Sequence, residues 1–330
     1  VSIADTLWHL LDTAWSDSPP LLRNVWTLEE ASSFQKVELQ IIDVLRNASW
    51  STKRNLGRWE VWAPSDVLIW SESANWALAS QQATVGDTLS LQMPERSLKE
   101  GETPLNWIIS NTPAPSQLPP PPFSNTRLRW DTLTPKNIGT IESDSLLILE
   151  VLEGTTLVEL EGFDVLLRFH GRPRDFPSLV EPSQLVAPLR YIASRSEFQK
   201  LKQAQHPKKA LDEFWLACAS SAESARGLLR TYYARVEEAN ASFSGLVEGW
   251  RSDRGMIHIV FGVPQRIRRD AYNEYWTYGE EGTANALTFH FRNKRNLLDD
   301  NAFELQRSLQ FRSVWDRGVS NWRNGRIRGD

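Results

Sequence analysis

The chain has 330 residues, of which 41% are hydrophobic and 24% charged, a composition that is ordinary for a globular protein and excludes a largely disordered chain. Its formal net charge of −4 provides no global positive field, which excludes nucleic acid as the expected partner. The single cysteine, Cys218, excludes an internal disulfide and a zinc site of four thiolates, and its apolar neighbours predict core packing.

Fifteen tryptophans are many for this length. Tryptophan combines a large apolar ring with one polar N–H group, so it favours packed joints and interfaces. No apolar run approaches the roughly 20 residues that a membrane-spanning helix needs. The chain begins at Val1 without Met, which leaves open that a signal peptide or a lipidated cysteine preceded it. We therefore expect more than one interface and keep a lipid anchor as an open alternative.

The first part of the chain changes its hydrophobic period near residue 35. Residues 3–15 have helical spacing and predict a short amphipathic helix that ends before Pro19. From residue 35 to 171, short apolar segments separated by Gly, Pro, Asn and Ser predict an antiparallel β-sandwich. The predicted strands are residues 37–41, 59–62, 67–70, 88–91, 107–109, 146–151, 157–160 and 165–169.

Two proline-rich stretches interrupt this pattern. Six prolines between residues 113 and 122 predict an extended loop that cannot pair as a central strand. Such a run can bind an aromatic groove of a partner, but a stiff surface connector is the default interpretation. The second stretch, residues 172–188, predicts the linker that leaves the sandwich.

Past this linker the period lengthens to about 3.6, which predicts a helical layer over residues 189–248. Ser194 followed by Glu197 has the form of a capping box, so we expect a helix to begin there. Three helical stretches follow, with breaks near Pro207 and at Ser220 and Ser221.

Residues 249–255 have the sequence Gly-Trp-Arg-Ser-Asp-Arg-Gly, and we call them the signature. An apolar run follows over residues 256–261 and predicts a buried strand that stops at Gly262 and Pro264. Asp253 stands beside Arg254, which favours a structural salt bridge or a turn cap over a cleft acid with a lowered pKa. We expect Trp250 and Trp276 to belong to the core rather than to a ligand platform.

Beyond residue 264 the sequence predicts the rest of a small sheet. Arg266, Arg268 and Arg269 form a basic cluster that could contact an anion or a partner, with a solvated turn as the default interpretation. Strand-like runs at 275–278 and 287–292 complete a three-stranded antiparallel sheet over residues 255–292.

The C-terminal residues predict a last helix and a tail. Asp299 or Asp300 is expected to cap a helix that runs through Phe303, Leu305 and Phe311. Residues 317–330 are rich in Arg, Gly and Asn and are predicted to be an exposed basic tail.

Motifs that carry chemistry are missing from the sequence. The histidines have no metal-ligand spacing, and there is no P-loop, no dinucleotide fingerprint and no nucleophile elbow. His258 and His290 could face each other across neighbouring strands, but a structural role is the default. We therefore expect no catalytic residue, no metal and no cofactor.

The signature, the following Gly-x-Pro and residues 274–278 (Glu-Tyr-Trp-Thr-Tyr) together resemble the GWxTD-domain family of bacterial cell-envelope proteins. Ser252 stands where the name motif has threonine and keeps the hydroxyl. Upstream positions agree as well, so the resemblance covers roughly residues 185–292. The positions that carry it are Gly249, Trp250, Asp253, Arg254, Gly255, Gly262, Pro264, Trp276 and Tyr278, preceded by Arg190, Tyr191, Glu197, Phe214, Trp215, Tyr233 and Arg235.

The resemblance implies a bacterial envelope location, periplasmic or outer-membrane associated, and it carries no established catalytic activity. A weaker similarity links the C-terminal sheet to small outer-membrane lipoproteins that assist β-barrel assembly, although convergence on a common sheet explains it equally well. We expect a non-enzymatic accessory or scaffold subunit that contacts other envelope proteins, for example in an outer-membrane complex. The open alternative is a carbohydrate-binding module or a hydrolase that uses tryptophan platforms and a carboxylate pair.

The sequence thus predicts an α+β multidomain protein with a small C-terminal sheet and helix. Its expected parts are an N-terminal helical segment (1–34), an antiparallel β-sandwich (35–171), a linker (172–188), a helical layer (189–248), a GWxTD-like α+β domain (249–316) and a basic tail (317–330).

Overall fold

The chain forms two compact units, residues 1–61 and residues 62–330. The helix predicted over residues 3–15 and the strand predicted over residues 59–62 lie outside the residues that the structure describes. In the first unit, β1 (Lys36–Asp43) and β2 (Ala48–Asn55) pair as an antiparallel hairpin, which confirms the strand predicted at 37–41. The computed structural model describes residues 36–43, 48–55, 67–73, 76–78, 81–92, 106–126, 134–143, 146–161, 165–270, 272–280, 286–294, 298–299 and 301–327.

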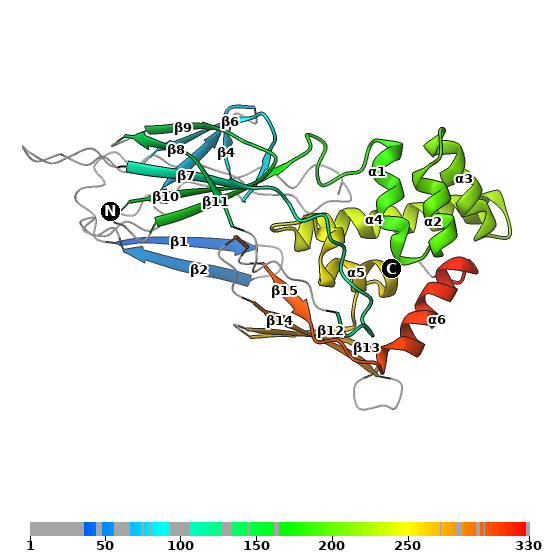
Figure 1. The fold of residues 1–330 in the computed structure, drawn as a ribbon. Coiled ribbons are helices and arrows are strands. Elements are labelled where there is room, and N and C mark those ends of the chain that lie inside the picture. The colour runs from blue at the N-terminus through cyan, green and yellow to red at the C-terminus, as the bar shows by residue number, and fades with distance from the viewer. Residues whose placement is uncertain are drawn as a thin grey trace, which may run out of the picture. The chain divides into compact units, whose positions relative to one another are not determined.

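The second unit begins with two β-sheets (Figure 1). Their strands are β3 (Leu68–Ser71), β4 (Trp76–Ala77), β5 (Gln82–Thr84), β6 (Thr88–Gln92), β7 (Asn106–Thr112), β8 (Lys136–Glu142), β9 (Leu146–Glu150), β10 (Gly154–Leu160) and β11 (Val165–Arg172). One sheet has the order β5-β11-β10-β7-β8 and the other the order β4-β3-β6-β9. The strands predicted at 67–70, 88–91, 107–109, 146–151, 157–160 and 165–169 are therefore confirmed.

The two sheets share one hydrophobic core because their strands alternate buried and exposed side chains. Leu147 and Leu149 of β9 are buried, whereas the alternate residues Leu146 and Ile148 are exposed. The same core contains Leu89 and Leu91 from the four-stranded sheet and Trp107 and Phe169 from the five-stranded sheet.

One strand pair departs from the predicted antiparallel arrangement, because β5 pairs with β11 in parallel. All the other pairs between the described strands are antiparallel. Residues 82–84 and 170–172 are far apart in the sequence, so no hairpin turn sets their relative direction.

His170 of β11 is fully buried in this part of the fold. Its Nδ1 lies 2.9 Å from Thr155 Oγ1, and its Nε2 has no hydrogen-bond partner in the described part of the chain. Burial, followed by the positive charges of Arg172 and Arg168, lowers the pKa of His170 to about 3. The folded protein therefore keeps this imidazole neutral over most of the acid range.

We expect His170 to make the second unit lose stability as the pH falls from 6.5 towards 3. In this window the unfolded chain binds a proton that the folded chain does not bind, so the free energy of unfolding falls with a slope of about 1.4 kcal/mol per pH unit. His170→Gln should remove this slope. Urea unfolding at several pH values measures it, and the exposed His206, changed to Gln, is the matched control. Identical profiles for His170→Gln and the wild type would contradict the prediction.

The predicted linker is partly helical. After β11, the short helix α1 (Pro182–Val186) and the 3₁₀ helix η3 (Ala187–Tyr191) bury Val186 and Leu189 in the second core. Pro182 and Pro188 stand at the first turns of these helices, where a missing N–H group does no harm.

Three longer helices follow, as the period of 3.6 predicts. They are α2 (Arg195–Lys202), α3 (Pro207–Ala217) and α4 (Ala222–Phe243), and their ends confirm the predicted breaks. Ser194 and Glu197 form the predicted capping box at the start of α2. Cys218 is buried in the core of this layer, which confirms its predicted packing role. None of the helices in the described residues is long and apolar enough to cross a membrane.

The apolar run after the signature is a helix, so the predicted strand is wrong. Helix α5 (Asp253–Phe261) begins at the N-cap Ser252, whose Oγ accepts a hydrogen bond from Gly255 N–H. Its residues from Asp253 to Val260 are all buried, so the sequence lacks the polar face that reveals an amphipathic helix. A short apolar run with this pattern is ambiguous between a strand and a buried helix.

The C-terminal sheet has four strands, so the predicted three-stranded sheet over 255–292 is wrong at both ends. Its order is β12 (Arg266–Arg269), β13 (Asn273–Tyr278), β14 (Leu287–Asn293) and β15 (Phe303–Leu305), with antiparallel neighbours. Residues 255–261 belong to α5 instead, and β15 occupies part of the predicted last helix.

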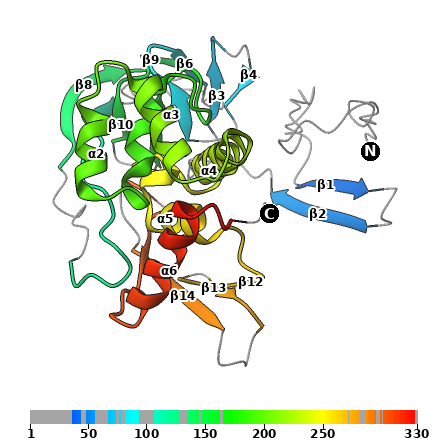
Figure 2. The same cartoon turned by 90° about the vertical axis from the view of Figure 1, so that its right-hand side faces the viewer.

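The last helix, α6 (Phe311–Arg323), starts later than predicted and includes part of the predicted tail. Asp299 does not cap it, because its carboxylate accepts from the N–H groups of Leu246 and Asn301, and Asp300 lies outside the described residues. Trp322 is fully buried and donates to Val260 O at 3.1 Å, so the expected exposed tail is wrong as far as Arg323. Figure 2 shows α6 beside α5 and the C-terminal sheet.

Candidate functional site

The signature forms a tight turn between helices α4 and α5. Residues Gly249–Arg251 make the 3₁₀ helix η4. A Cβ atom on Gly249 would lie 1.7 Å from Ala239 O, and one on Gly255 would lie 1.9 Å from Gly249 O. Both atoms belong to the backbone, so the two glycines are required by the close approach of α4, η4 and α5.

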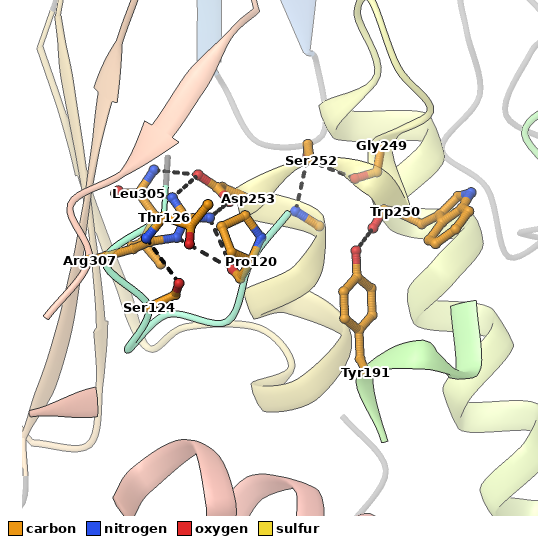
Figure 3. Close-up of polar contacts among 11 residues, drawn as sticks. Pro120, Ser124, Thr126, Tyr191, Gly249, Trp250, Ser252, Asp253, Leu305 and Arg307 are labelled. Atoms are coloured by element: carbon orange, nitrogen blue, oxygen red, sulfur yellow. Dashed lines mark hydrogen bonds and ion pairs between the residues drawn. The ribbon is translucent and has the colours of Figure 1, made fainter. Parts of the chain in front are cut away.

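Trp250 is a core residue, as predicted, with 7% of its surface exposed. Its N–H donates to Asn240 Oδ1 at 3.2 Å, and its carbonyl accepts from Tyr191 Oη at 2.7 Å. Figure 3 shows the Tyr191 ring pointing at this backbone. Ser252 Oγ donates to Gly249 O at 2.7 Å. Threonine offers the same hydroxyl, which explains why Ser252 can stand in its place.

Asp253 pairs with Arg307, a residue that sequence patterns did not single out (Figure 3). Its Oδ2 accepts from Arg307 Nη1 at 3.1 Å and from Leu305 N–H at 2.7 Å, and Arg307 Nη2 also contacts Oδ1. The side chain of Asp253 is 1% exposed and that of Arg307 is 6% exposed. Burial raises the pKa of Asp253, and the charge of Arg307 opposes that rise.

Arg307 also connects the signature to the proline-rich loop of residues 113–122. Its Nη2 donates to Pro120 O at 3.1 Å, and Arg251 Nη2 donates to Pro115 O. Pro119 and Pro122 are buried, so the loop is more than the predicted surface connector. It contains no strand, as predicted.

The structural salt bridge predicted for Asp253 is present, but its partner is Arg307 and not the neighbouring Arg254, which pairs with Glu274. Consecutive residues of a helix do not face each other. Arg254 Nη1 lies 3.2 Å from Glu274 Oε2, and its guanidinium carbon lies 4.3 Å from the ring centre of Phe303. Burial lowers the pKa of Arg254, and the charge of Glu274 opposes that change.

Glu274 of β13 is the centre of this second ion-pair group. Its Oε1 accepts from Trp276 Nε1 at 2.8 Å and from Arg269 Nη2 at 3.0 Å. Burial alone would raise the pKa of Glu274, but these hydrogen bonds and the charge of Arg254 hold it below its usual value. Trp276 is thereby fixed in the core, as predicted.

The other residues of the resemblance support the surrounding layers. Gly262 ends α5 with φ of 79°, and its carbonyl accepts from Tyr278 Oη at 2.9 Å. Glu197 binds Arg323 at 2.7 Å, which is the main reason that its pKa lies at about 2. Phe214 and Tyr233 pack against Trp215, and Arg235 lies over Trp322. The exposed Arg190 lies over Phe198, and Pro264 is buried between α5 and β12.

The three predicted anion contacts, Arg266, Arg268 and Arg269, lie on the exposed strand β12. Arg269 pairs with Glu274, and the Arg268 guanidinium lies 5.7 Å from the ring centre of Tyr275. These contacts of Arg268 and Arg269 join β12 to β13.

His258 and His290 lie on α5 and β14 and do not face each other across neighbouring strands, so the less favoured of the two interpretations is wrong. His258 lies on α5 with Nε2 2.8 Å from Glu238 Oε2, whereas His290 stacks on Tyr275 and lies 2.8 Å from Asn273 Oδ1. Among the described residues, no three His, Cys, Asp or Glu side chains form a group that could hold a metal.

The tryptophans whose burial is described offer no open platform. Trp107, Trp215, Trp250, Trp276, Trp315 and Trp322 are buried, and Trp70 is half-buried. The buried tryptophans and the paired charges of the signature therefore form a site that can fix the helices, the sheet and the loop to one another.

Residues 162–324 match the GWxTD domain. The matched range begins just before β11 and ends one residue past α6, so it includes the helix that resembled a tail. No curated protein and no solved structure matches the chain.

Proposed function

Because residues 162–324 belong to the GWxTD-domain family, we propose that the protein is a non-enzymatic accessory or scaffold subunit of the bacterial cell envelope. It works through contacts with other envelope proteins, in the periplasm or at the outer membrane. The observation that carries this proposal is the internal use of the signature. Asp253 and Arg254 are buried and paired within the chain, so the residues that define the family stabilise the fold instead of facing a substrate.

Exposed aliphatic side chains on two edge strands support a protein partner. Strands β8 and β9 are each paired on one side only within the described residues. They expose Ile138, Ile141, Leu146 and Ile148, which we call the apolar ridge. An edge strand with exposed aliphatics is a template for a further strand. We propose that the two sheets form a β-sandwich and that a partner protein adds a strand at the ridge.

Cross-linking in the native host, followed by purification of the tagged full chain from envelope fractions, tests this function. We expect one or a few envelope proteins to copurify in a fixed ratio. Ile138→Lys combined with Ile148→Lys should reduce their recovery at least about tenfold, since each buried aliphatic contributes roughly 1.5–3 kcal/mol to an interface and 1.4 kcal/mol is a factor of ten. The melting temperature of this double variant should stay unchanged, because the side chains of Ile138 and Ile148 are exposed in the wild type.

Val180→Lys is the matched control, because Val180 is an exposed aliphatic outside the ridge. It should leave the copurifying proteins unchanged. Recovery of the chain as a monomer without partners after mild detergent extraction would contradict the proposal. Saturable binding to a glycan that is lost with one tryptophan would favour the carbohydrate-binding alternative instead.

A further inference from the structure

A pocket of about 370 Å³ lies between α4, α5, α6 and the ends of strands β13 and β14. This volume lies at the small end of the range for ligand sites. The pocket is separate from the signature ion pairs, because Asp253, Arg254, Glu274 and Arg307 do not line it. Its residues come from segments that are distant in the sequence, so only the folded chain builds it.

Among the described residues, three guanidinium groups and no carboxylate line this pocket. They belong to Arg235 of α4, Arg317 of α6 and Arg326, which follows α6. Arg235 is 4% exposed, donates to Ile259 O at 3.4 Å, and holds its guanidinium 5.3 Å from the ring centre of Trp322. Arg317 and Arg326 are exposed, and their side chains make no ion pair or hydrogen bond in the described part of the chain.

The described acidic residues on the neighbouring elements have other partners or do not line the pocket. Glu238 of α4 binds His258, and Asp316 of α6 faces Arg312. Glu280 follows the lining residue Gly279 but does not itself line the pocket. The described lining residues therefore have an excess of positive charge.

The remaining walls are largely apolar. Phe261 of α5, Leu287 of β14 and Ile327 contribute half-buried side chains. A ligand in this pocket can therefore meet both hydrocarbon and guanidinium groups. Guanidinium groups bind carboxylates and phosphates through paired, charge-assisted hydrogen bonds.

We propose that this pocket binds a small anionic amphiphile, in which one carboxylate or phosphate group is attached to an apolar body. The acid group contacts Arg317 and Arg326 with Arg235 behind them, and the apolar body packs against Phe261, Leu287 and Ile327. This inference goes beyond the scaffold function and does not depend on it.

Calorimetric titration of the full chain tests the ligand class with simple probes. Decanoate and decyl phosphate, each below its critical micelle concentration, represent the two acid groups. We expect saturable binding at one site for at least one of them, and the tighter one identifies a carboxylate or a phosphate as the natural head group. Decyl maltoside, acetate and inorganic phosphate should bind at least about tenfold more weakly, because each lacks either the charge or the apolar body.

Variants test the location of the site. Arg317→Gln and Arg326→Gln should each weaken the binding of the preferred probe about tenfold, the effect of losing one charge-assisted hydrogen bond, without changing the melting temperature. Arg312→Gln is the matched control, since this exposed arginine of α6 does not line the pocket. The proposal is overturned if neither acid binds saturably, if the maltoside binds as tightly as the acids, or if the folded double variant Arg317→Gln/Arg326→Gln binds like the wild type.

Discussion

Gly249→Ala is expected to abolish folding of the GWxTD domain or to lower its free energy of unfolding by more than about 4 kcal/mol. The added methyl carbon would lie 1.7 Å from Ala239 O and 2.4 Å from the carbonyl carbon of the same residue. These backbone atoms of α4 cannot move aside as a flexible side chain can. Relief requires η4 to separate from α4, which would break the hydrogen bond from Trp250 N–H to Asn240. Circular dichroism melts and urea unfolding measure the effect.

The same helix provides the matched control for this substitution. Gly227 of α4 is exposed, and a Cβ atom there would meet nothing within 4 Å. Gly227→Ala should therefore stabilise the domain by about 0.5–1 kcal/mol, because alanine is the better helix former. If Gly249→Ala melted like the wild type, the turn would be able to move without loss, and the structural role assigned to the signature would be wrong.

Asp253→Asn should lower the free energy of unfolding by about 3–5 kcal/mol, the usual effect of removing one member of a buried ion pair. The change keeps the shape of the Asp253 side chain but removes its negative charge. Arg307, whose side chain is only 6% exposed, then loses the carboxylate with which it pairs. Asparagine can still accept from Leu305 N–H, so the loss reports the unpaired guanidinium. Urea unfolding of the purified chain gives the value.

A double-mutant cycle with Arg307→Gln isolates this pair. The double variant should be less destabilised than the sum of the two single variants, because neither charge is then left alone. Asp316→Asn is the control, since its pair with Arg312 is exposed and its loss should change stability by less than about 1 kcal/mol. Additive single effects, or a full loss of partner binding with normal stability, would contradict the structural role of Asp253.

Features that depend on neighbours in the sequence could be predicted from the sequence. Ser194 and Glu197 satisfy each other's backbone groups three residues apart, so the start of α2 was visible in the chain itself. Strands β6, β7 and β9 follow from their alternation, because successive side chains of a strand point to opposite faces. Strand β8 is exposed along almost its whole length, so it has no such pattern and was not predicted. The spacing of the signature and its aromatic companions likewise sufficed to identify the family that residues 162–324 match.

The tertiary structure decided which distant residues meet. Helix α5 is buried on every side, so its sequence has no polar face and no period that separates it from a strand. The partner of Asp253 is Arg307, 54 residues away, rather than its neighbour Arg254, because only the packing of β15 beside α5 brings the two charges together. Trp322 lies in an arginine-rich segment that resembles a tail, yet α6 buries it against α5. Local sequence sets the hydrogen bonds within an element, whereas the burial of a side chain depends on surfaces that other elements supply.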